Sequence, residues 1–379
     1  MSLHIKFSDL PSALAYRISD NSNSVSPRPV VRSIVGTCGR VGLRWPLGMI
    51  SGLAAMLSSG QASAHVKWFG AYNVAGQPRG LENVLCPDFE QLTTLAISLL
   101  LVGAVVERTF IGEPLLRAFD RVTSGLRSNT EILFRATCGF FFVALWTVGG
   151  ILLTPELKTT SAAIPWLQLA IAAGLIWRRT MPLSALGIVF PFGLALRSYG
   201  VFHLMDYPIF LGVAAYLALT GLQRNLFGVR PLDIVRWAAA ITLMWASIEK
   251  WAYPEWTFPL LTTHTTMTMG YDREFFMRAA GVVEFTLAFA LIWTPLVRRS
   301  AAIMLAATFI SAVFDFGKID AIGHSAIIAV LFAIAADDAR ALQEKRHPLF
   351  VPVSYGTALA GFLAVYYVGH SALFGTTIL

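Results

Sequence analysis

Long apolar runs separated by short polar stretches fill the chain from residue 89 almost to its end. A helix needs about 20 apolar residues to cross the hydrocarbon core of a bilayer. The runs that reach or approach this length are 89–106, 132–153, 162–177, 182–197, 206–222, 234–252, 278–297, 300–315, 321–336 and 351–372. Several middle runs are short, so we expect tilt or partial burial within a bundle. The pattern predicts an all-α fold, a polytopic membrane bundle of about ten transmembrane helices in the mature chain.

The composition agrees with a protein that faces lipid. Hydrophobic residues make up 56% of the chain and charged residues only 13%, whereas roughly a quarter of a soluble protein is charged. The net charge of +7 comes from short basic clusters between the apolar runs. We therefore expect a lipid bilayer as partner and no nucleic acid.

The basic clusters occupy every second loop. Their members are Arg108, Arg117, Arg121 and Arg127, then Arg178 and Arg179, then Arg224, Arg230 and Arg236, then Arg298 and Arg299, and finally Arg340, Lys345 and Arg346. Cytoplasmic loops are enriched in Lys and Arg. This alternation places the basic loops in the cytoplasm of a bacterial inner membrane and both mature ends in the periplasm.

Residues 1–64 have the layout of an N-terminal extension followed by a signal peptide or a signal anchor. A basic flank and an apolar stretch of about 14 residues precede small residues at Ala62 and Ala64, as at an A-x-A cleavage site. The alternative is an uncleaved first helix. In both cases His65 begins an outer-face segment, 65–88. Cleavage would give His65 a free α-amino group, which would chelate one metal ion together with the imidazole.

Five of the seven histidines map to the outer face in this topology: His65, His203, His264, His324 and His370. Neutral imidazole is the commonest metal ligand and suits copper, zinc and iron. We favour copper, because Met267 and Met269 beside His264 are soft ligands. Lipid head groups also tolerate interfacial histidines. The chain has no HxH or HxxxH pair, so a metal site would depend on convergence in space.

Ionisable and aromatic side chains lie at a similar depth. The candidate acid–base groups are Glu249, Asp320 and Glu284, and the candidates for contact with a cofactor are Lys250, Trp251 and Tyr253. Ionisable groups in membrane helices are functional candidates by default. Simpler interpretations are also open, since the aromatic residues fit an interfacial belt and Lys250 can extend to the head groups. We expect a structural ion pair of Glu284 with Lys250 or Arg236.

Two segments read alike and predict an internal repeat. Residues 175–177 match residues 291–293, each before an arginine pair, and Asp206 falls on Asp320 after a small gap. We infer two parallel four-helix units, 131–222 and 231–336. Residues 89–130 form the first mature helix and a basic loop, and 337–379 a cytoplasmic loop and the last helix.

The second unit resembles the DoxX/DoxD family of four-helix membrane proteins. Arg236 and Lys250 have the spacing of the family's opening signature, and Gly281 and Glu284 are similar to its G-x-x-E helix. The first unit keeps an arginine, Arg135, but lacks the lysine and the glutamate. The resemblance covers roughly a quarter to a third of the chain. It implies a fold, and a link to quinone-coupled redox chemistry.

Three functions follow as hypotheses. The first is a membrane oxidoreductase or its subunit, in which an outer-face metal site, quinone or haem supports redox chemistry with a periplasmic redox partner. The second is a protein that takes up or delivers copper at the periplasmic face, together with a metal carrier. The third is an assembly subunit without chemistry. No nucleotide-binding motif and no CxxCH haem attachment occurs in the sequence.

Overall fold

The computed structural model describes residues 66–338 and 347–378. The predicted signal segment, His65, Arg340, Lys345 and Arg346 therefore lie outside the described residues. Within them the regular elements are helices, which confirms the all-α prediction. The helices are η1 (Val66–Trp68), α2 (Leu81–Val84), α3 (Pro87–Val106), α4 (Gly112–Ser128), α5 (Thr130–Val148), α6 (Ala163–Gly174), η2 (Arg178–Thr180), α7 (Met181–Leu204), α8 (Pro208–Gly221), α9 (Pro231–Ala252), η3 (Pro254–Trp256), α10 (Phe258–Thr263), η4 (Thr265–Thr268), α11 (Arg273–Ala290), α12 (Pro295–Ala336), η5 (Pro348–Phe350) and α14 (Val351–Phe374).

Among the described residues, five helical segments are long and apolar enough to cross a membrane. They are Pro87–Val106, Thr130–Val148, Arg178–Leu204, Pro295–Ala336 and Pro348–Phe374. Helices α6 and α8 are apolar but have only 12 and 14 residues. At 1.5 Å per residue they are shorter than the roughly 30 Å of a bilayer core.

Glycines with positive φ interrupt or end two of the helices. Gly317 (φ 74°, ψ −149°) divides α12 into two helical parts, which correspond to the predicted runs 300–315 and 321–336. Gly149 and Gly150 (φ 70° and 66°) end α5, so the prediction of helix over 132–153 is wrong in its last residues. Only glycine adopts such φ values at little cost.

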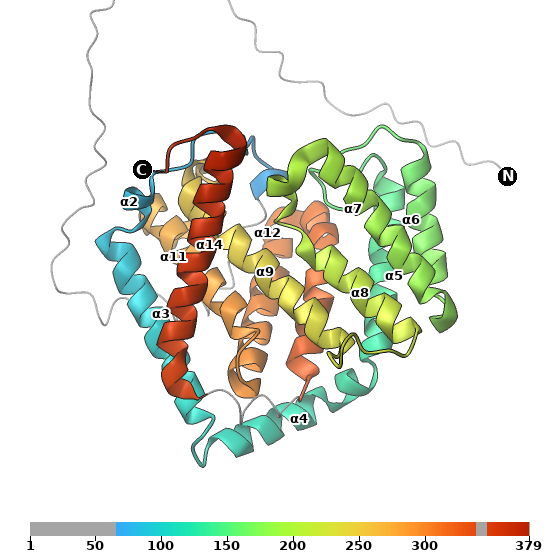
Figure 1. Cartoon of the computed structure of the whole chain (residues 1–379), viewed down its shortest axis with the longest axis horizontal. Coiled ribbons are helices and arrows are strands. Elements are labelled where there is room, and N and C mark those ends of the chain that lie inside the picture. Colours follow the sequence, from blue (N-terminus) through green and yellow to red (C-terminus); the bar gives the residue numbers. More distant parts are fainter. Residues whose placement is uncertain (1–65, 339–346, 379) are drawn as a thin grey trace, which may run out of the picture. The chain divides into compact units, whose positions relative to one another are not determined.

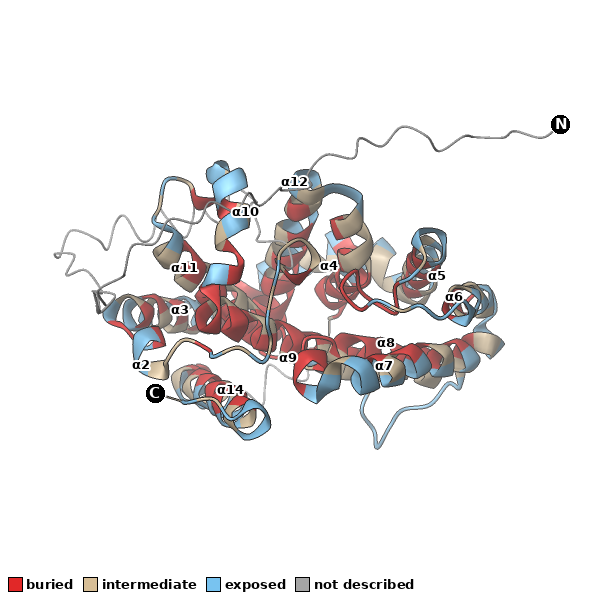
Figure 2. Ribbon diagram, turned by 90° about the horizontal axis from the view of Figure 1, so that it is seen from above, coloured by how far each residue is buried: buried red, intermediate tan, exposed pale blue. Residues whose placement is uncertain are grey.

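Helix α9 occupies the middle of the bundle, and most of its residues are buried (Figure 2). It packs against α8 and α11. Helix α8 approaches it closely at Gly212, where an added Cβ would collide with Ala238. Helices α3 and α14 lie side by side in the other half of the bundle (Figure 1). Helix α3 also packs against α11, and α14 also packs against α9.

Helix α4 lies where the sequence predicted only a basic loop. Its 17 residues are amphipathic: Leu116 and Thr123 are buried, while Leu115 and Val122 are exposed. It runs across one end of the bundle and packs against α12 (Figure 1).

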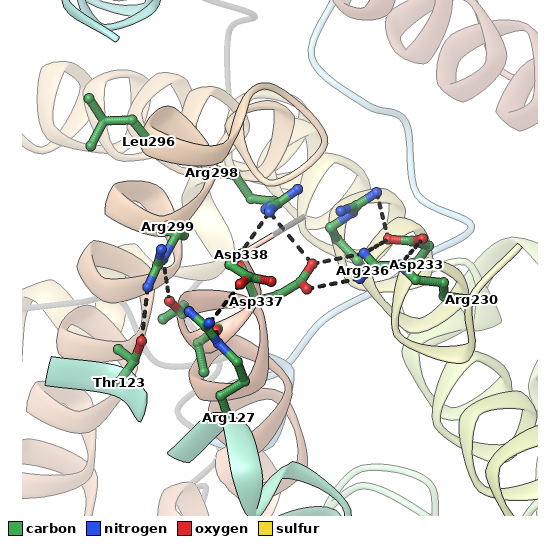
Figure 3. Close-up of polar contacts among 12 residues, drawn as sticks. Thr123, Arg127, Arg230, Asp233, Arg236, Leu296, Arg298, Arg299, Asp337 and Asp338 are labelled. Carbon is green, nitrogen blue, oxygen red and sulfur yellow. Dashed lines mark hydrogen bonds and ion pairs between the residues drawn. The ribbon is translucent and has the colours of Figure 1, made fainter. Parts of the chain in front are cut away.

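The basic loops gather at that same end, as their alternation in the sequence predicts. Arg299 bonds to Asp120 and Thr123 of α4, at 2.7 and 2.8 Å, and Arg127 of α4 bonds to Asp338 at 2.6 Å. A neighbouring group joins Arg230, Arg236 and Arg298 to Asp233 and Asp337 (Figure 3). These ion pairs connect the ends of α4, α9 and α12.

Candidate functional site

Residues 66–79, which begin with η1, enter the end of the bundle opposite to the arginines, and we call them the inserted segment. Lys67 is buried, with 3% of its surface exposed. Its ammonium group donates to Asp206, in the link between α7 and α8, and to Oε1 of Glu249 on α9 at 2.6 Å. It also lies over the rings of Tyr72 and Trp256, 5.8 and 5.6 Å from their centroids. We call Lys67, Asp206 and Glu249 the Lys67 triad.

The triad keeps a buried ammonium group charged. Burial by itself lowers the pKa of Lys67, but the adjacent carboxylates of Asp206 and Glu249 outweigh this effect and raise the pKa above its ordinary value. Both side chains of the Lys67–Asp206 pair are fully shielded from solvent. Removal of one partner would leave an uncompensated buried charge.

A cavity of about 70 Å³ lies next to the triad, between α8, α9, α11 and α12. Trp68 lies on one side of it and the apolar side chains of Ile209, Phe210 and Phe309 on others. Its volume exceeds the roughly 10–15 Å³ that one water molecule needs. The cavity therefore has room for a ligand larger than water.

Ionisable groups line this cavity in pairs. Lys250 binds Glu284 at 2.8 Å, which confirms the pairing expected from the sequence. His324 Nδ1 lies 2.9 Å from Oδ2 of the fully buried Asp320. Asp206 contributes its carboxylate, whose Oδ1 has no hydrogen-bond partner among residues 66–338 and 347–378.

Trp68 connects the inserted segment to the His324 pair. Its ring lies 4.7 Å from the imidazole of His324, and Phe309 lies at the same distance from that imidazole. Gly323 permits this approach, because an added Cβ would collide with the indole. One short segment thus places Lys67 against Asp206 and Trp68 against His324.

Three other histidines, His203, His264 and His370, lie at the same end but in separate surroundings. His203 packs against Tyr72 and Tyr199, and His264 packs against Phe316. His370 bonds to the Tyr253 hydroxyl at 2.8 Å. In the part of the chain that the structure describes, no three His, Cys, Asp or Glu side chains group as metal ligands. The copper site, which involves His65, stays a prediction.

The candidates for contact with a cofactor separate in the structure. Lys250 lines the cavity. Trp251 instead donates to the carbonyl oxygen of Arg278 at 3.2 Å and packs on Phe89. Tyr253 stacks on Trp256, with 4.1 Å between ring centroids, and donates to the carbonyl oxygen of Gly76. Trp251 therefore holds α9 against α11 and α3, and Tyr253 holds the inserted segment.

Two charged residues near the cavity were missed in the sequence. Lys67 was visible as the one cation directly after the predicted cleavage site, within the aromatic stretch "KWF". Glu156 is a carboxylate in an otherwise apolar stretch between two helices, "ILLTPEL". Neither signal reveals the surroundings of its residue, because the partners of Lys67 are distant in the sequence and nothing local shows that Glu156 is buried.

The helices and the buried ion pairs together define a helical multi-pass membrane protein with a polar cavity near one end of its bundle. Comparisons with family models, with curated proteins and with solved structures found no match for this chain. The likeness of residues 231–336 to the DoxX/DoxD family stays a prediction.

Proposed function

We propose that the protein binds the head group of a quinone or quinol in the cavity and exchanges protons with it. One observation carries the proposal: three acid–base groups, each paired with a buried or partly buried side chain, line one cavity whose other walls are apolar and aromatic; they are Asp206, Glu284 and His324. A quinone oxygen accepts a hydrogen bond and a quinol hydroxyl donates one. Lys250 can supply the donor, and Asp206 or Glu284 can supply the acceptor.

The redox role follows from the ligand that we propose. Oxidation of a quinol releases two electrons and two protons, so the electrons require an acceptor outside the described residues. We propose a periplasmic redox partner for them. The protein would then be an oxidoreductase or the quinone-binding subunit of one.

The proposed topology places the cavity on the periplasmic side of a bacterial inner membrane. The basic loops lie at the opposite end, and basic loops face the cytoplasm. Arg178 binds Glu131, at the start of α5, at 3.4 Å. Both α5 and α6 therefore run between the two ends. We propose ten crossings, with the short α6 and α8 accommodated by burial or local thinning of the bilayer.

We also propose that the two four-helix units are related by duplication. Each unit has a glycine with positive φ near the end of its third helix, Gly200 (φ 82°) and Gly317 (φ 74°). Each then has a buried aspartate, Asp206 and Asp320. The two aspartates face the same inserted segment, one through Lys67 and the other through the pair of His324 with Trp68.

Equilibrium binding of a short-chain quinone tests the ligand. The protein in lipid nanodiscs is titrated while tryptophan fluorescence is recorded, because Trp68 lines the cavity. We expect saturable quenching, and at least about tenfold weaker binding in Glu284→Gln, since one charged hydrogen bond is worth about 1.5–3 kcal/mol. Glu82→Gln, at an exposed position, is the matched control. Equal affinity in both variants would refute the proposed site.

A further inference from the structure

The connection between α5 and α6 is a buried loop, although the sequence shows it as an ordinary outer loop. Residues 151–157 are all buried. The loop closes through hydrogen bonds from Leu152 N to Leu157 O at 2.7 Å and from Thr159 N to Gly150 O at 3.0 Å. Gln168 of α6 donates to the carbonyl oxygen of Ile151 at 2.7 Å. Irregular backbone at this depth persists only where its polar groups are satisfied within the protein.

The tip of this loop carries a carboxyl group towards the site. Thr154 lines the cavity, and Glu156 is 7% exposed. Neither carboxyl oxygen of Glu156 has a hydrogen-bond partner in the described part of the chain. Tyr199 of α7 holds the loop from outside, since its hydroxyl donates to the Glu156 carbonyl oxygen at 3.3 Å.

The charged and titratable groups that interact with Glu156 or its loop come from three other segments, one of which is α7 with Tyr199. Lys67 and Tyr72 belong to the inserted segment, and Asp206 to the link between α7 and α8. The ammonium group of Lys67 already binds Asp206 and Glu249. The ammonium group thus binds two of the three carboxyl groups, and Glu156 is the one that it does not bind.

A buried carboxylate without a hydrogen bond is costly, and such a group usually takes up a proton instead. The pKa of Glu156 agrees, because burial raises it to about 8. Lys158, two residues further along the loop, is exposed. The loop that carries Glu156 therefore reaches the surface two residues further along the chain.

We propose that Glu156 is a proton-binding site of this cluster, which holds a proton at neutral pH and exchanges it between the Lys67 triad and the outer solution. The proposal deepens the proposed function, since protons taken from a quinol in the cavity need a route out of the protein. The step itself is a simple ionisation: the carboxylic acid becomes a carboxylate and the proton passes to water. No redox change at Glu156 is involved.

Infrared spectroscopy of the carboxylic acid carbonyl band, followed as pH is raised, tests this assignment without any ligand. We expect the wild-type protein to show a protonated carboxyl at neutral pH that titrates near pH 8. The band should be absent in Glu156→Gln, which keeps the shape and neutrality of the protonated side chain, and present in the control Glu82→Gln.

Two results would overturn the proposal. One is the absence of the band from the wild-type protein at neutral pH, a result that does not depend on the folding of any variant. The other is a band that persists in Glu156→Gln and disappears in Glu249→Gln, which would assign the proton to the triad itself. Failure of quinone binding would refute the proposed function but leave the band intact, so the two outcomes are distinguishable.

Discussion

Replacement of Lys67 by methionine removes the single positive charge that two buried carboxylates share. Methionine keeps most of the apolar volume, so the change isolates the charge. For the pair with Glu249, separated by 2.6 Å, Coulomb's law with an effective dielectric constant of about 20 gives about 6 kcal/mol. The desolvation of the ammonium group, which costs several kcal/mol, opposes this attraction. We therefore expect Lys67→Met to lower the free energy of unfolding by about 3–5 kcal/mol, the usual cost of breaking a buried pair.

The assay is reversible unfolding in mixed micelles, monitored by circular dichroism. Lys158→Met is the control, because Lys158 is exposed and should change stability by less than about 0.5 kcal/mol. A triple variant, Lys67→Met with Asp206→Asn and Glu249→Gln, should recover most of the loss, because no unpaired charge remains. A loss below about 1 kcal/mol in the single variant, or no recovery in the triple variant, would refute the account of the triad.

Three further predictions concern the cavity and the two ends of the bundle. The pKa of Glu156 is about 8 against an ordinary 4.5, so between these pH values the folded state binds one proton more than the unfolded state. The stability of the wild-type protein therefore falls as pH rises through this range, by up to about 1.4 kcal/mol per pH unit. Thermal scans should show a smaller fall in Glu156→Gln, and parallel pH curves for the two proteins would contradict the prediction. Gly323→Ala should displace the indole of Trp68 from the cavity, cost about 1–3 kcal/mol and shift the tryptophan emission. Gly139→Ala, where an added Cβ meets open space, should leave the emission unchanged. Equal emission spectra of the two variants would argue against the packing of Trp68 on Gly323. Arg299→Met should lower the free energy of unfolding by about 3–5 kcal/mol in chemical unfolding, because its guanidinium group is fully buried and bonds to α4 and α12. Arg117→Met, at an exposed position, should lower it by less than about 0.5 kcal/mol. Similar losses in both variants would contradict the role of the arginine ion pairs at this end of the bundle.

The apolar runs predicted the positions of the helices well, because contact with lipid and core imposes a local requirement on each stretch. All ten predicted runs overlap described helices. The alternation of basic loops also placed the arginine clusters at a common end. The pair of Lys250 and Glu284 was predictable for a similar reason, since both residues lie near the outer ends of neighbouring helices and each needs a partner.

The remaining features depend on contacts between distant residues. Lys67 reaches Asp206 and Glu249 across 139 and 182 residues of sequence, and no local pattern encodes that choice. Glu156 follows a proline in the connection between two helices, which is typical of an exposed turn, although the loop is in fact buried. Helix α4 was not predicted, because the basic residues of 112–128 indicated a cytoplasmic loop and their amphipathic spacing was not considered. His203, His264, His324 and His370 share one end of the bundle, but depth alone does not bring side chains into contact.

The location of a bound quinone tests the central claim most directly. The chain offers a second hollow, a groove of about 880 Å³ between α6 and α7 with apolar walls that include Leu167 and Phe190. A photoreactive short-chain quinone is cross-linked to the protein in nanodiscs, with and without excess unmodified quinone, and the labelled peptides are mapped by mass spectrometry. The account predicts competable labelling of peptides that contain Trp68, Phe309 or His324. Labelling confined to the groove, or labelling that excess quinone does not reduce, would contradict it.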